Sequence, residues 1–169
     1  MKLVHEKLPN LEAFYLQQLR VLLSAEEQLV RALPHMAETA TDPELKQAFR
    51  THQRETEAQA LRLRTILDPL AGDVDLIKCK VIGALIDEAE DMIQEADHDP
   101  VRDAALIAAA QRVEHYEIAA YGAVQHFARV LGREEDATLL QQTAEEEKHA
   151  DRLLTGISER INPLARKAA

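Results

Sequence analysis

The stretch that decides the fold runs from Val101 to Leu131, and its centre reads Gln111-Arg-Val-Glu-His-Tyr-Glu-Ile-Ala-Ala-Tyr-Gly122. An almost wholly apolar run, Ala104 to Ala110, precedes this centre and predicts a long, largely buried helix. Glu114 and Glu117 are three residues apart and so share one face of that helix. Burying a carboxylate is costly unless a cation or hydrogen bonds replace its water. We attribute the pair to a metal site.

The composition indicates an all-α protein of one domain, residues 1–169. Hydrophobic residues make up 46% of the chain and aromatic residues 4%, and Trp is absent. The net charge of -10 argues against nucleic acid or a membrane surface as partners. Cys79 is the only cysteine, which excludes an internal disulfide and a rubredoxin-type iron centre. The first residues contain no apolar run typical of a signal sequence, so we expect a cytoplasmic protein.

Five helices are expected, with capping residues, proline and glycine near their ends. The first follows Asn10 and is kinked or ended by Pro34, and the second runs from Asp42-Pro43 to about Leu67, before Asp68-Pro69. The third runs from about Asp75 to Ala96, and the fourth from Asp99-Pro100 to Gly132. The fifth runs from about Glu134 to Arg160, before Asn162-Pro163. The tail, residues 164–169, is expected to be frayed. No strand pattern is present.

Acidic residues interrupt the apolar faces of these helices at matching heights. If the first two helices form an antiparallel hairpin, Glu26 and Glu55 lie level, and in the last two Glu117 and Glu146 do the same. The expected inward face of the fifth helix is Leu139, Thr143, Glu146, Ala150, Leu153 and Ile157. The third helix is long enough to carry the chain back along the bundle. The acids, Glu114 included, should therefore converge at mid-bundle.

Several carboxylates this close together cannot all be ionised unless cations lie among them. Two divalent metal ions would solve the charge problem, and Glu146-x-x-His149 offers an oxygen and a nitrogen ligand one helical turn apart. Glutamate with histidine suits iron or manganese, and zinc is an alternative.

The segment Val101 to Gly122, together with Ser24-Ala-Glu-Glu-Gln-Leu29 and Glu145-Glu-Glu-Lys148, closely resembles the YciF-like bacterial stress proteins of the ferritin-like superfamily. The resemblance covers nearly the whole chain. It implies a ferritin-like four-helix bundle with an additional long helix in the crossover between helices two and four. It also implies a homodimer with a role in stress responses, although some members are known only as structural proteins.

The acids are also similar to the di-iron pattern of rubrerythrin. That resemblance assigns Glu26 as the first-helix ligand and Glu55 as the bridging acid, and it adds Glu114 with Glu117 and Glu146 with His149. Ala58 stands where the pattern has a histidine, so Glu117 or His52 would have to replace that ligand.

Each candidate also has a purely structural interpretation. Glu26 and Glu55 could be core-edge acids paired with arginine, and His149 could simply donate a hydrogen bond. His52 is more typical of a core histidine, and Tyr121 is either a packed core residue or a hydrogen-bond donor to Glu117. The remaining histidines are expected at the surface or its boundary: His5, His35, His98, His115 and His126.

Two functions of different classes remain open. The first is a di-iron oxidase or peroxidase that reacts with peroxide or dioxygen and, having one cysteine, needs an external electron donor. The second is a non-enzymatic structural or interaction protein of the stress response whose metals stabilise the bundle. A DNA-shielding mini-ferritin is least favoured, because the negative charge opposes DNA binding.

Overall fold

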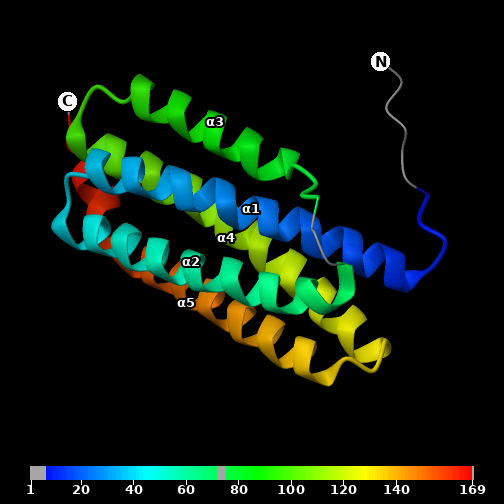
Figure 1. The fold of residues 1–169 in the computed structure, drawn as a ribbon. Helices are drawn as coiled ribbons and strands as arrows, with labels where there is room; N and C mark the ends of the chain where they lie inside the picture. Colours follow the sequence, from blue (N-terminus) through cyan, green and yellow to red (C-terminus); the bar gives the residue numbers. More distant parts are fainter. Residues whose placement is uncertain (1–6, 72–74, 169) are drawn as a thin grey trace, which may run out of the picture.

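The computed structural model describes residues 7–71 and 75–168, and these residues form an all-α structure. Its helices are α1 (Leu11–Thr39), α2 (Pro43–Ala71), α3 (Lys80–Glu95), α4 (Asp99–Val130) and α5 (Glu134–Ala165). The pairs α1–α2 and α4–α5 are adjacent hairpins that lie side by side, and α3 packs along the outside of α4 and α1 (Figure 1). The expected all-α class is confirmed, and in the described residues no strand occurs.

Local capping chemistry sets three of the helix ends, as the sequence predicts. The Asn10 side chain accepts a hydrogen bond from the backbone N–H of Ala13 at 2.9 Å and opens α1. The Asp42 carboxylate opens α2 by accepting from the N–H groups of Glu44 and Leu45, each at 3.0 Å. After α4, Gly132 has a φ of 71°, a left-handed conformation that glycine adopts without strain and that ends the helix.

Two expected helix ends, before Pro69 and before Pro163, were wrong, and Pro34, which was expected to kink or end the first helix, does not end it. Pro34 lies inside α1, Pro69 inside α2 and Pro163 inside α5, which continues to Ala165 and so includes part of the expected frayed tail. A proline removes one backbone hydrogen bond, and burial of neighbouring apolar residues offsets that loss. Leu33 and Ala37 are buried on either side of the first proline.

The third helix is shorter than expected and begins at Lys80 rather than near Asp75. The residue before it is tied to α1, because the N–H of Cys79 donates to the Ser24 hydroxyl at 3.1 Å and its carbonyl accepts from the Gln28 side chain at 3.1 Å. These bonds hold the end of the connection in a non-helical conformation.

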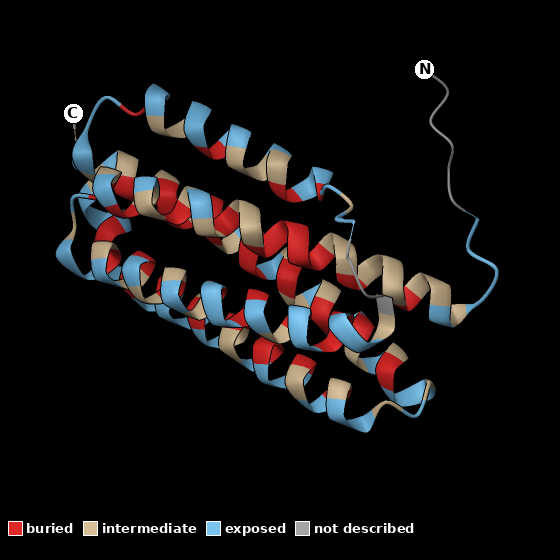
Figure 2. Ribbon diagram, viewed as in Figure 1, coloured by how far each residue is buried: buried red, intermediate tan, exposed pale blue. Residues whose placement is uncertain are grey.

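The core consists of two apolar clusters separated by a polar layer. One cluster includes Leu29 and Leu33 of α1, and the other includes Leu19 and Leu22 of the same helix. On α2, α4 and α5 the side chains of His52, of Glu114 with Glu117, and of Glu147 fall in sequence between the two apolar sets, and on α1 Glu26 lies near the boundary between them. Buried residues line the facing sides of these helices in Figure 2. The fold thus surrounds a group of ionisable side chains with apolar packing at both ends.

None of the helices in the described part of the chain combines the length and the apolar character needed to cross a membrane.

Candidate metal centre

The polar layer brings four ionisable side chains from three helices together. His52 comes from α2, Glu114 and Glu117 from α4, and Glu147 from α5, and each offers one ligand atom within 4.8 Å of the others. All four are buried. We call them the His/Glu cluster, and they are a group that could hold a metal ion.

The imidazole of His52 lies among carboxylates on several sides. Its Nε2 is 3.3 Å from Oε1 of Glu114 and 3.8 Å from Oε2 of Glu147. Its Nδ1 is 3.6 Å from Oε2 of Glu55, one turn along the same helix. His52 is thus the one nitrogen donor in a layer of carboxylate oxygens, within the residues that the structure describes.

Glu26 of α1 adjoins this cluster and is fully buried. The phenol of Tyr121 on α4 donates a hydrogen bond to its Oε1, while its Oε2 is free of hydrogen bonds from the described residues. Tyr121 therefore orients this carboxylate, whereas the sequence left it open as a packed core residue or a hydrogen-bond donor to Glu117. Among the described residues Oε2 of Glu26 has no hydrogen-bond partner, arginine included, which argues against a simple core ion pair.

Many ligand atoms of this layer have no hydrogen-bond partner among the described residues. They are both nitrogens of His52, both carboxylate oxygens of Glu147, Oε2 of Glu26, Oε2 of Glu114 and Oε1 of Glu117. Folded proteins satisfy nearly all buried polar groups, so this many unpaired atoms in one place calls for a missing partner. A cation surrounded by these atoms would satisfy them together.

The pKa values of the buried groups in the layer also indicate that a positive charge is missing there. Burial, and then the charge of Glu147, raise the pKa of Glu26 to about 8. Burial likewise raises the pKa values of Glu114 and Glu117 well above their usual range. For His52, burial lowers the pKa, but the neighbouring carboxylates outweigh it and raise the value to about 10. The carboxylates thus hinder one another's ionisation in the absence of a cation.

Glu146 lies outside the cluster, which corrects the expected inward face of the last helix. Its two oxygens accept hydrogen bonds from the Arg62 guanidinium at 2.6 and 2.7 Å, and one of them also accepts from Gln59 at 3.2 Å. Its side chain is 25% exposed, whereas that of Glu147 is 0% exposed. Glu147, which the sequence analysis missed, is therefore the buried acid of α5.

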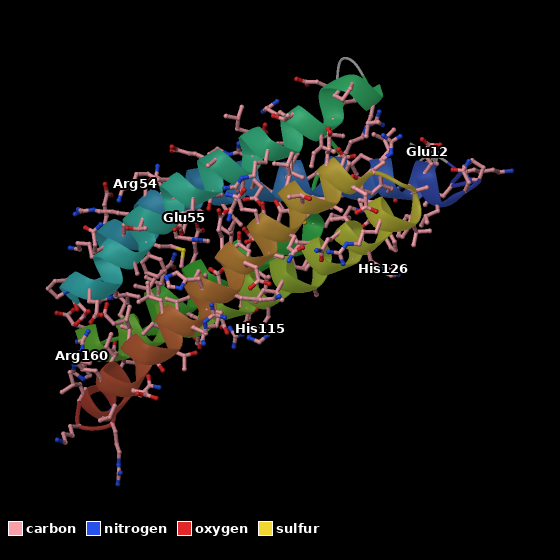
Figure 3. The ribbon with its side chains drawn as sticks, turned by 90° about the horizontal axis from the view of Figure 1, so that it is seen from below. Glu12, Arg54, Glu55, His115, His126 and Arg160 are labelled. Carbon is pink, nitrogen blue, oxygen red and sulfur yellow. The ribbon has the colours of Figure 1, made fainter. Side chains whose placement is uncertain are left out.

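The other two residues proposed from the rubrerythrin pattern lie at the edge of the layer. The Glu55 side chain is 37% exposed and lies near His52, and Figure 3 shows it on α2 beside Arg54. His149 is exposed, although it lines the same cavity as His52 and Glu55. The structure brings together Glu26, Glu114, Glu117, His52 and Tyr121, but not Glu146 and His149.

The remaining histidines lie where the sequence placed them, at the surface. His35, His98, His115 and His126 are exposed, and Figure 3 shows two of them on α4. His5 lies outside the described residues.

The donor set fits a metal ion that prefers oxygen with some nitrogen. Carboxylate oxygens and one imidazole suit iron or manganese, whereas the absence of thiolate among these ligands disfavours soft metals. The fit rests on the unpaired oxygen and nitrogen atoms described above.

Comparison with known proteins gives consistent matches over nearly the whole chain. Residues 10–166 match the family described as a domain of unknown function, DUF892. The chain is 41% identical over 160 residues to protein YciF of Escherichia coli K12, covering 94% of this chain and 95% of YciF.

Two solved structures share the fold of this chain and more than a third of its residues at aligned positions. The crystal structure of the E. coli stress protein YciF matches with a TM-score of 0.88 at 39% identity, covering 92% of this chain and 99% of that one. YcfI from Rhodopseudomonas palustris, which is provisionally described as a structural protein, matches with a TM-score of 0.86 at 36% identity, covering 90% and 98%.

Proposed function

The chain belongs to the DUF892 family and to the YciF-like stress proteins, and from this premise we propose that it is a metal-binding stress-response protein. The bundle is a single ferritin-like domain, and its polar layer holds two metal ions, with iron as the first candidate. The observation that carries the proposal is the set of buried carboxylate and imidazole atoms left without hydrogen-bond partners among the described residues.

The ligands that the geometry favours are Glu26, His52, Glu114, Glu117 and Glu147. Glu147 takes the place in the proposal that the sequence gave to Glu146, because Arg62 already neutralises Glu146. Glu55 and His149 stay as predicted ligands at the edge of the layer. Glu55 is the nearer candidate, since its carboxylate lies 3.6 Å from His52.

The protein's own residues would set the properties of the metal site. Tyr121 holds Glu26 in one orientation, and the apolar clusters on both sides keep bulk water from the layer. Four acidic ligands supply enough negative charge to balance two divalent ions. When bound, an iron pair would supply one-electron chemistry toward peroxide or dioxygen. The chain has one cysteine, so an external electron donor would have to complete any turnover.

The second candidate function is a structural or interaction protein whose metals only stabilise the bundle. The relative YcfI, provisionally described as structural, favours it. A homodimer, a cytoplasmic location and the lack of nucleic-acid or membrane partners remain part of the proposal under both functions.

Metal analysis of the protein purified from iron-replete cells tests the proposal. We expect about two metal ions per chain, and Glu114→Ala should lose them while the exposed Glu145→Ala on α5 keeps them. The metal-loaded protein is then exposed to hydrogen peroxide and, separately, to dioxygen while its absorption spectrum is recorded. Rapid oxidation supports the enzyme, and bound metal inert to both oxidants supports the structural role. Unchanged metal content in Glu114→Ala would refute the metal site.

A further inference from the structure

Gln59 of α2 is a buried polar residue that the proposed metal site does not use. Its exposed fraction is 0%, and it follows His52 by about two turns on the same helix face. Phe49 of α2 belongs to one apolar cluster and Ala60 to the other. Between these two residues the buried side chains of α2 are all polar, namely His52, Thr56 and Gln59. Gln59 is therefore part of the polar layer.

The amide nitrogen of Gln59 has a partner, but its oxygen has none among the described residues. Its Nε2 donates to Oε2 of Glu146 at 3.2 Å, whereas its Oε1 is buried without a hydrogen bond. The hydroxyl of Thr56 differs in this respect, because it donates to the backbone carbonyl of His52 at 2.8 Å. A buried carbonyl oxygen without a donor costs free energy. Oε1 of Gln59 therefore needs a partner, as the carboxylates of the layer do.

Glu146 determines which end of the Gln59 amide faces it. Burial acts to raise the pKa of Glu146, but hydrogen bonds from Arg62 and Gln142 outweigh it and lower the value. This carboxylate is therefore ionised at neutral pH and can only accept hydrogen bonds. Arg62 donates to both of its oxygens, at 2.6 and 2.7 Å, which holds it in one position. The nitrogen of the Gln59 amide must face Glu146, so the oxygen faces away from it.

The same ion pair connects Gln59 to the layer on two other helices. Arg62 also donates to the hydroxyl of the buried Thr143 at 3.0 Å, one turn before Glu147 on α5. Burial and the charge of Glu147 raise the pKa of Glu26 on α1, and the charge of Arg62 acts against them. The guanidinium therefore lies close enough to interact with this carboxylate. Gln59, which shares the Glu146 carboxylate with Arg62, lies beside the same acids.

Charge balance favours a neutral donor at this place. The four buried glutamates of the layer already match the charge of two divalent ions, and Arg62 matches the charge of Glu146. A carboxamide oxygen adds a ligand without adding charge. Carbonyl oxygens also suit the same hard ions as carboxylates, manganese among them.

Burial on α2 follows the same shift of one residue as on α5. Ala58, where a ligand was expected, is exposed, and the next residue, Gln59, is buried. On α5, Glu147 is buried in place of Glu146. The inward position of α2 at this height thus carries an oxygen donor.

We propose that the side-chain carbonyl oxygen of Gln59 is a neutral ligand of the metal centre, and that Glu146, held by Arg62, orients the amide so that this oxygen faces the ions. The inference rests on the proposed metal-binding function and adds a ligand that carries no charge. It also gives the Arg62–Glu146 ion pair a positioning role, although Glu146 itself is not a ligand.

Gln59→Leu tests the ligand directly, because leucine is of similar size and has no oxygen. A competition titration with a chelator measures the affinity for manganese(II). We expect the affinity for at least one ion to fall about tenfold or more, since even residues that only orient a ligand have effects of this size. Gln142→Leu is the matched control, because Gln142 also donates to Glu146, at 3.1 Å, but is exposed on α5. It should keep the affinity of the natural protein.

Urea unfolding distinguishes a ligand from an amide with a purely structural role. A ligand that binds only in the folded state stabilises it, so added manganese should stabilise Gln59→Leu less than the natural protein or Gln142→Leu. If Oε1 instead accepts a hydrogen bond from a buried water, Gln59→Leu should lose the same stability with and without manganese and keep its affinity. That result would overturn the proposal.

A measurement on the natural protein does not depend on a folded variant. The side-chain carbonyl carbons of isotope-labelled glutamines are followed by NMR while zinc(II), a diamagnetic ion, is added. The Gln59 resonance should shift on binding, and that of Gln142 should shift much less. Bound zinc with an unshifted Gln59 resonance would refute the role of Gln59 and leave the proposed function standing. A natural chain that takes up neither zinc nor manganese would refute both.

Discussion

Removing the metal is expected to make the folded chain less stable as the pH rises from about 5 to about 8, the opposite of what a paired carboxylate produces. The cause is the buried Glu26, whose pKa is raised by burial and then by Glu147 from 4.5 to about 8. Between these two values the folded carboxyl holds its proton while the unfolded one has lost it. The folded state thus binds more protons, and rising pH favours unfolding.

The size of the effect follows from the same shift. A group whose pKa is raised on folding contributes a slope of up to about 1.4 kcal/mol per pH unit between its two pKa values. Glu26 alone should therefore cost roughly 3 kcal/mol between about pH 5 and pH 7. That is a large part of the 5–15 kcal/mol or so that stabilises a typical domain.

His52 acts in the same direction at higher pH. Its pKa rises from 6.5 to about 10 because the carboxylates outweigh the effect of burial. The stability that its charged form contributes is complete below about pH 6.5 and is lost as the pH rises toward 10. The two groups together extend the decline over the whole neutral range.

Urea unfolding of the metal-free protein at a series of pH values measures this slope. Glu26→Gln should reduce the slope of the unfolding free energy against pH by the contribution of one titrating group. Glu145→Gln, at an exposed position, should leave this slope unchanged. With metal bound the slope should reverse, because metal binding requires deprotonated ligands and strengthens with pH. A metal-free protein whose stability is constant or rises between about pH 5 and 8 would refute the reasoning.

Three further outcomes are expected from single substitutions. Glu147→Gln should reduce the metal content measured by elemental analysis, whereas Glu146→Gln should leave it intact; the reverse result would restore the ligand that the sequence predicted. Tyr121→Phe removes the donor to Glu26 and should weaken metal binding about tenfold in a competition titration with a chelator. The carboxylate of Asp103 on α4 accepts hydrogen bonds from the N–H and hydroxyl of Thr41 and from the N–H of Asp42, at the α1–α2 turn. Asp103→Ala leaves these three donors without their acceptor and should lower the free energy of unfolding, measured in urea, by about 3 kcal/mol. The metal content should stay unchanged, which serves as the control.

The starts of the first two helices could be predicted from the sequence because they depend on local chemistry, whereas the start of the third, tied to α1 through Cys79, could not. Asn10 and Asp42 cap their helices with their own side chains, and Gly132 adopts the left-handed conformation that its residue type favours. Helix ends near proline could not, since the outcome depends on packing between distant segments. Pro34 stays inside α1 because the apolar neighbours on both sides of it are buried in the bundle.

The buried acids of α4 were predictable from the sequence, the buried acid of α5 was missed by one residue, and Glu55 and His149 lie farther out than expected. Glu114 and Glu117 follow an apolar run that fixes which face is buried, and the structure buries both. In the last helix the acids Glu145 to Glu147 are consecutive, so a heptad count that started from Leu139 selected the wrong one. Leu140, which is buried, would have selected Glu147, seven residues later.

The position of the polar layer confines the cost of losing metal to the middle of the bundle. The apolar clusters at either side, one around Leu29 and the other around Leu19, contain no acid, so we expect them to keep their packing in metal-free protein. The repulsion that raises the pKa values of Glu26, Glu114 and Glu117 arises within the polar layer, and local separation of the helices would relieve it. Metal-free protein should therefore exchange its mid-helix amide hydrogens faster than those of the two clusters, and binding of metal should remove this difference. If the proposed metal ions bind, the ionisable layer would hold the helices together at the centre of a bundle whose two ends are packed by apolar side chains.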